Sequence, residues 1–142
     1  MADKNAQLEA ETWILEKFLP KKYGQSFQQK NLTLQSRGQF KFDAVSDDNE
    51  IVAVISTGAG LTPGGKVATD ALMKVRSAAL WVLMLEMTPQ KRLLVLSDQS
   101  MIDVVKDERK RGRFPKEFEI VKVKLPPELS GKSEESGQNS KP

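Results

Sequence analysis

The sequence predicts a single α/β domain in which helices flank a mixed central sheet, with elements in the order α-β-β-β-α-β-α-β. Two apolar segments, Phe40–Val45 and Ile51–Thr57, flank a polar turn, which is typical of a β-hairpin. The second segment contains no charged residue, which indicates a central strand buried on both faces. Two later apolar runs, Arg92–Ser97 and Phe118–Leu125, each follow a helical segment, so we expect strands joined by right-handed crossovers.

The segments before the hairpin predict one helix and one strand. Apolar residues recur at the helical period over Ala6–Leu19, and we expect Pro20 to end this helix. Leu32 and Leu34 alternate with polar neighbours inside Phe27–Gln35, which predicts the first strand.

The segments after the hairpin predict a loop and two helices. Four glycines and one proline make Gly58–Gly65 a loop. A long helix is expected over Lys66–Met87, and its second half is apolar nearly all round, so we expect that half to be buried. Asp98 or Ser100 is expected to cap a further helix over Met101–Lys110.

Composition limits the chemistry and the location of the protein. The 142 residues fit one domain over residues 1–125, and the polar residues 126–142 predict a disordered C-terminal tail. The chain has no cysteine and no histidine, so any bound metal would be a hard, oxygen-ligated ion such as Mg²⁺. The net charge of +3 is compatible with nucleic acid. The longest apolar stretch, Ala78–Leu85, is too short to cross a bilayer, so we expect a cytoplasmic protein with no membrane partner.

The hairpin with its Phe42-Asp43-Ala44-Val45 segment, together with Asp70-Ala71-Leu72-Met73-Lys74-Val75 in the helix after it, resembles the PD-(D/E)XK nuclease superfamily. The resemblance covers the chain from about Leu8 to Leu125 and implies a restriction-endonuclease-like fold. In that family an Asp closes the first hairpin strand, and the second strand carries an acid, a hydrophobe and a lysine. The matching triplet here is Val54-Ile55-Ser56, so the active-site motif is degenerate.

The resemblance also implies a site. Asp43 would be the metal ligand, Glu11 (or Glu9) would come from the first helix, and Lys74 would replace the strand lysine. Mg²⁺ would be the cofactor of an active enzyme. Because the strand acid and lysine are missing, we expect a catalytically impaired nuclease-like protein that binds nucleic acid or a partner protein. An active magnesium-dependent DNA nuclease with a rearranged site is the alternative, and the family's habit of dimerising makes a homodimer a further expectation.

These residues also have simpler interpretations. Asp43 beside a turn is often a solvated or turn-capping residue, and Glu11 borders the apolar face of its helix as a surface residue would. Asp70 and Lys74 stand four residues apart, the spacing of a surface ion pair.

Gly60–Val67 satisfies the G-x-x-x-x-G-K pattern of a phosphate-binding P-loop and stands between an apolar strand and a helix. A P-loop-like nucleotide binder is therefore a second alternative. Val67 occupies the place of the magnesium-binding Ser or Thr, and a flexible loop explains the glycines equally well.

A basic cluster, defined as Arg109, Lys110, Arg111 and Arg113, ends the helix predicted before Gly112. We expect these four residues to contact phosphates if nucleic acid is a partner, with little sequence preference. A positive helix end also complements the helix dipole without any ligand.

Overall fold

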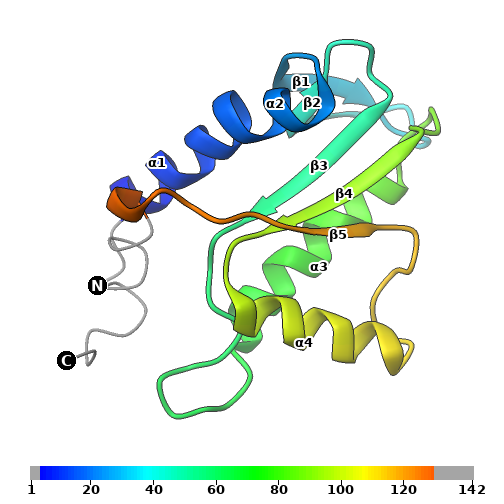
Figure 1. Ribbon diagram of the computed structural model, residues 1–142. Helices are drawn as coiled ribbons and strands as arrows, with labels where there is room; N and C mark the ends of the chain where they lie inside the picture. Colours follow the sequence, from blue (N-terminus) through cyan, green and yellow to red (C-terminus); the bar gives the residue numbers. More distant parts are fainter. Residues whose placement is uncertain (1–3, 130–142) are drawn as a thin grey trace.

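A computed structural model describes residues 4–129, and in it five strands form one sheet with helices on both faces (Figure 1). The helices are α1 (Lys4–Trp13), the π-helical η1 (Ile14–Phe18), α2 (Leu19–Tyr23), α3 (Thr69–Leu83) and α4 (Gln99–Lys110). The strands are β1 (Phe27–Thr33), β2 (Gln39–Ser46), β3 (Ile51–Ser56), β4 (Lys91–Leu96) and β5 (Glu119–Lys122).

The strands lie in the order β1-β2-β3-β4-β5. The first three pair antiparallel, and β3, β4 and β5 pair parallel. The predicted α/β class, the mixed sheet and the antiparallel pairing of the two hairpin segments are confirmed.

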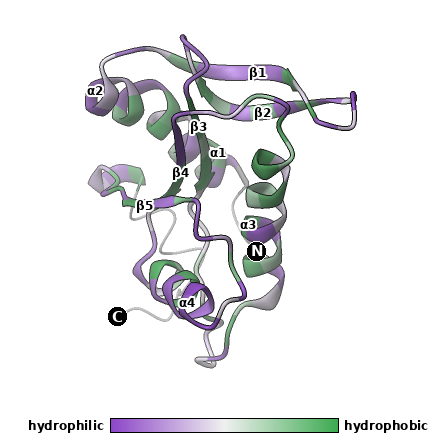
Figure 2. Cartoon of the chain, turned by 90° about the vertical axis from the view of Figure 1, so that its right-hand side faces the viewer, coloured by the Kyte–Doolittle hydropathy of each residue, from purple (hydrophilic) through white to green (hydrophobic). Residues whose placement is uncertain are grey.

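Two apolar cores lie on the two faces of the sheet. α3 and α4 pack on one face, where β3 contributes Val52 and Val54. α1, η1 and α2 pack on the other face, where β3 contributes Ile51 and Ala53. Figure 2 shows hydrophobic colour along β3 and β4 and hydrophilic colour on β1, which is an edge strand. The expectation that Ile51–Thr57 forms a doubly buried central strand is correct for its first four residues.

Pro20 does not end the first helix, contrary to the sequence prediction. The helical path continues through η1 into α2 and ends at Gly24, whose φ of 73° is left-handed. A proline inside a helix removes one backbone donor and crowds the carbonyl four residues earlier. The wider π-helical turn of Ile14–Phe18 directly precedes it and gives that carbonyl room, because π-turns relax the ordinary helical spacing.

The long helix is shorter than predicted. Lys66 and Val67 belong to the preceding loop, where Leu61 and Val67 form a β-bridge, and α3 runs only over Thr69–Leu83. The expected complete burial of its second half is wrong, because Leu80 is 56% exposed. The bounds of α4 agree better with the predicted helix. Asp98 caps α4 by accepting a hydrogen bond of 3.1 Å from the Met101 amide.

The last strand is also shorter than predicted, although packing continues beyond it. Val123 and Leu125 are buried in the α1-side core, and Leu129 packs against the same core. The chain is therefore still packed past residue 125, and the remainder of the predicted tail, residues 130–142, lies outside the described residues.

Candidate functional site

β2 and β3 separate from one another along most of their length. Only Ala44↔Ala53 and Val45↔Val52 pair between them. The first half of β2 pairs with β1 instead, and the last half of β3 pairs with β4. We call the opening between Gln39–Asp43 and Val54–Ser56 the wedge.

Contacts with the end of α3 hold the wedge open. Leu34, just after β1, forms an isolated bridge with Leu85, and the Gln35 amide donates to the Met84 carbonyl at 2.8 Å. On β2, the Phe40 ring stacks on Trp81 with centroids 4.2 Å apart and planes 9° apart. The tip of the β1–β2 hairpin therefore follows α3 and leaves β3.

Asp43 occupies a β-bulge at the inner end of the wedge. Two residues of β2, Asp43 and Ala44, stand between the paired Phe42 and Val45, whereas β1 has only Gln29 in the matching interval. Phe42 and Val45 consequently both face the α3 side although they are three residues apart. A bulge of this kind redirects a side chain, and Asp43 is left exposed at the cavity described next.

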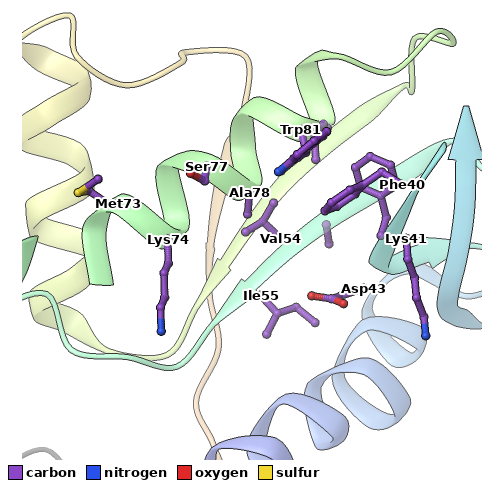
Figure 3. A pocket seen from close by; sticks show the side chains of 13 residues that line it. Phe40, Lys41, Asp43, Val54, Ile55, Met73, Lys74, Ser77, Ala78 and Trp81 are labelled. Carbon is purple, nitrogen blue, oxygen red and sulfur yellow. The ribbon is translucent and has the colours of Figure 1, made fainter. Parts of the chain in front are cut away.

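A cavity of about 430 Å³ fills the space between the wedge and α3. Asp43 lies on the β2 wall, Lys74 lies on the α3 wall, and Val54 and Ile55 of β3 lie between them (Figure 3). Val54, at the position that would carry the strand acid in the resembling family, is thus apolar here. Lys41 also borders the cavity, but its side chain extends away from α3 (Figure 3).

Glu11 approaches Asp43 from α1. Burial raises the pKa of the half-buried Glu11 carboxyl above its ordinary value, and repulsion by the Asp43 carboxylate raises that pKa further. Within residues 4–129 neither side chain makes a hydrogen bond or an ion pair. The two carboxylates therefore lie close enough to repel one another, and neither has a cationic partner within residues 4–129.

The three residues proposed for a nuclease site are thus brought to one region. Asp43 and Lys74 share the cavity, and Glu11 acts on Asp43 from the α1 side. Asp70 and Lys74 make no ion pair in the described part of the chain, so the Lys74 ammonium is unpaired. Over residues 4–129 no group of three or more acidic side chains is close enough to hold a metal ion.

The basic cluster is largely occupied by contacts within the protein. Arg113 forms two bonds to the Glu108 carboxylate, at 2.9 and 2.7 Å, and Arg76 of α3 adds a third at 2.8 Å. Arg111 pairs with Asp107 at 3.0 Å. The remaining arginine, Arg109, donates to the Phe118 carbonyl at 3.0 Å, which leaves Lys110 as the unpaired member among the described residues.

Several backbone amides of the glycine loop, residues 58–68, already donate hydrogen bonds within the protein. The Thr62 amide donates to the Lys66 carbonyl at 2.7 Å, and the Gly65 amide donates to the Thr62 carbonyl at 2.9 Å. The Gly60 amide donates to the Ser100 hydroxyl at 2.9 Å. A phosphate cradle needs such amides free and aimed at the ligand, so this geometry disfavours the nucleotide-binding interpretation of the loop.

Close packing explains why a glycine stands at position 60. A Cβ at this position would lie 2.5 Å from the Met101 Cα, because the loop backbone rests directly on the first turn of α4.

Phe40 and Trp81 are site residues that sequence reasoning missed. They stand forty-one positions apart, and only the tertiary contact joins them at the cavity. The bulge is not visible in the sequence, because Phe40, Phe42 and Ala44 keep the two-residue period of a regular strand.

No protein-family model, curated protein or solved structure matches the chain. The restriction-endonuclease-like fold therefore stays a prediction. None of the helices in the described residues is long and apolar enough to cross a bilayer.

Proposed function

We propose that this chain is a restriction-endonuclease-like protein with an impaired nuclease centre that binds nucleic acid without cleaving it efficiently. The observation that carries this proposal is the apolar floor of the cavity, where Val54 and Ile55 separate Asp43 from Lys74. Mg²⁺ keeps several of its waters when it binds protein carboxylates, and these waters need hydrogen-bond acceptors. Aliphatic side chains supply none, so cation affinity at this position should be weak.

The second candidate is an active nuclease with a rearranged site. It is favoured by the approach of Glu11 to Asp43 and by the unpaired Lys74 across the cavity. A magnesium ion held by the two carboxylates would polarise a phosphodiester and activate water. Lys74 would then stabilise negative charge that develops on the phosphate.

A cleavage assay separates the two candidates. Purified protein is incubated with supercoiled plasmid and either Mg²⁺ or Mn²⁺, beside Asp43→Ala, and duplex binding is measured by fluorescence anisotropy without metal. We expect binding in the micromolar range or weaker that decreases steeply with salt, as for contacts with the phosphate backbone. Any trace of nicking should be equal in the wild type and the variant.

Each outcome decides between the candidates. Cleavage that disappears in Asp43→Ala establishes the active nuclease. A protein that neither binds nor cleaves DNA or RNA contradicts both candidates and favours a partner protein.

A further inference from the structure

The cavity joins an aromatic surface to an unpaired cation. Phe40 and Trp81 stack on one another, both line the cavity, and both remain partly exposed. Lys74 lines the same cavity about two helical turns before Trp81 on α3, and in the described residues its ammonium has no partner. Ser77 lies between Lys74 and Trp81 on that helix and adds a hydroxyl.

These features match the two parts of a nucleotide. The rings and the aliphatic floor offer a flat apolar surface on which a base can stack, and Lys74 offers a charge for a phosphate. The volume of about 430 Å³ lies within the range of roughly 300–1,000 Å³ for ligand pockets. The neighbouring Asp43 carboxylate disfavours a second anion beside it, so the cavity suits one phosphate and not a row of them.

We infer that this cavity is a subsite for one unpaired nucleotide, with the base against the Phe40–Trp81 pair and the phosphate at Lys74. The inference rests on the proposed binding of nucleic acid. A base inside a duplex has neighbours on both faces and its edge is paired, so it cannot reach the rings. The protein should therefore prefer single strands over duplexes, and the paired arginines of the basic cluster should contribute little.

The test uses Trp81 as its own reporter. The chain has two tryptophans, Trp13 and Trp81, so Trp13→Phe leaves a single indole at the cavity. This variant is titrated with a single-stranded oligothymidylate, a duplex of equal length, and the free nucleotides dTMP and ATP. Binding is followed by quenching of Trp81 and, for the oligonucleotides, independently by anisotropy. We expect the single strand to quench Trp81 and to bind about tenfold or more tightly than the duplex.

Three substitutions locate the ligand. Phe40→Leu should weaken binding of the single strand about 5- to 100-fold through loss of stacking. Lys74→Ala should weaken it and reduce its salt dependence. Lys66→Ala is the matched control, because Lys66 is an exposed lysine of the glycine loop away from the cavity lining. Thermal melting of each variant shows whether it is folded, and Lys74→Ala changes an exposed side chain, so it keeps the test valid if Phe40→Leu does not fold.

The results separate failure of this inference from failure of the proposed function. Equal binding of single strands and duplexes, with Trp81 unquenched, overturns the nucleotide subsite but leaves nucleic-acid binding intact. Absence of binding to every oligonucleotide overturns both. Free nucleotides that bind and depend on Lys74 support the subsite and identify a small-molecule source, whereas dependence on Lys66 alone assigns binding to the glycine loop and overturns it.

Discussion

The buried carboxylate at the end of α4 is paired with arginines, whereas the carboxylates at the wedge and beside it have no cationic partner among the described residues. At the end of α4, Glu108 is only 9% exposed, and two arginines from different segments hold its carboxylate. Hydrogen bonding from Arg113 lowers the pKa of Glu108, and the charges of Arg113 and Arg76 lower it further against the opposing effect of burial. Beside the wedge, on α1, Glu11 is half-buried and has no cationic partner among the described residues. Burial raises its pKa, and repulsion by the Asp43 carboxylate raises that pKa further.

The difference separates structural charges from available ones. A carboxylate whose oxygens are already bonded stabilises the fold and has little left to offer a ligand. A carboxylate held beside another one destabilises the fold, and groups of this kind gather at functional sites. Most members of the basic cluster, which looks functional in the sequence, are paired within the protein and are therefore structural charges. The available charges lie at the wedge and beside it, in a region that looks apolar in the sequence.

The largest effect is expected where the glycine loop rests on α4. Gly60→Ala places a methyl group 2.5 Å from the Met101 Cα, and backbone on both sides prevents an easy shift. We expect a loss of stability of about 1–3 kcal/mol, measured by urea unfolding. Gly64→Ala is the control, because its Cβ would meet nothing closer than 3.9 Å. Equal stability of the two variants would mean that α4 is not fixed by this contact.

A large effect is also expected at Glu108. Glu108→Ala leaves Arg76 and Arg113 without their shared partner, and we expect the melting temperature to fall by several degrees at pH 7. Because folding lowers the pKa of Glu108, its contribution is complete above the ordinary value of 4.5 and is lost as the pH falls through the lowered folded value. The wild type and the variant should therefore converge in acid.

Asp107→Ala is the matched control for Glu108. Its partner Arg111 stands four residues along the same helix, and both side chains are more than half exposed. Such a pair contributes about 0.3–0.5 kcal/mol. If both substitutions produced the same small change, the bonded carboxylate of Glu108 would be no more structural than a surface pair.

Sequence reasoning recovers the elements that depend on local pattern. The hairpin, the apolar β3 and the Asp98 cap are visible as alternation, composition and a capping residue, and the structure contains all three. The predictions miss contacts that are determined by a residue elsewhere in the chain. The partner of Glu108 on α3, the partner of Phe40 at Trp81, and the carbonyl that binds Arg109 are separated from them in the chain. The prediction that Pro20 ends the first helix is wrong for a different reason. The π-helical turn before it relieves the crowding that a proline causes inside a regular α-helix.

The candidate site likewise has a part that the sequence indicates and a part that it does not. The resemblance alone points to Glu11, Asp43 and Lys74, and the fold brings them near one another, because sheet order and helix placement follow from the predicted elements. The cavity could not be predicted. It depends on the bulge at Asp43 and on the hairpin tip following α3, and both are properties of tertiary pairing.

A smaller effect of opposite sign is expected at Glu11, beside the wedge. Glu11→Gln removes a charge that the fold disfavours and should raise the melting temperature at pH 7 by less than Glu108→Ala lowers it. Folding raises the pKa of Glu11, so its stabilising protonated form is fully present below 4.5 and is lost as the pH rises through the raised folded value. The gain in the variant should therefore vanish in acid and grow toward neutrality. A loss of stability at pH 7 would show that Glu11 has a structural partner.

The smallest and most specific effect concerns the coupling of Glu11 to Asp43. Asp43→Asn removes the repulsion but leaves the burial, and burial is the larger of the two causes. The pKa of Glu11, followed by NMR of its side-chain carboxyl carbon, should therefore fall but remain above its ordinary value. An unchanged pKa would place the two carboxylates too far apart to act together.

The same NMR titration repeated with Mg²⁺ returns to the nuclease question. A cation held between the carboxylates would favour their ionised forms and lower the pKa of Glu11 in the wild type but not in Asp43→Asn. The apolar Val54 and Ile55 beside Asp43 lead us to expect no difference between the two proteins beyond the screening that any salt produces. A magnesium-dependent shift confined to the wild type would instead favour the active nuclease, because it would show that the wedge holds a metal without the missing strand acid.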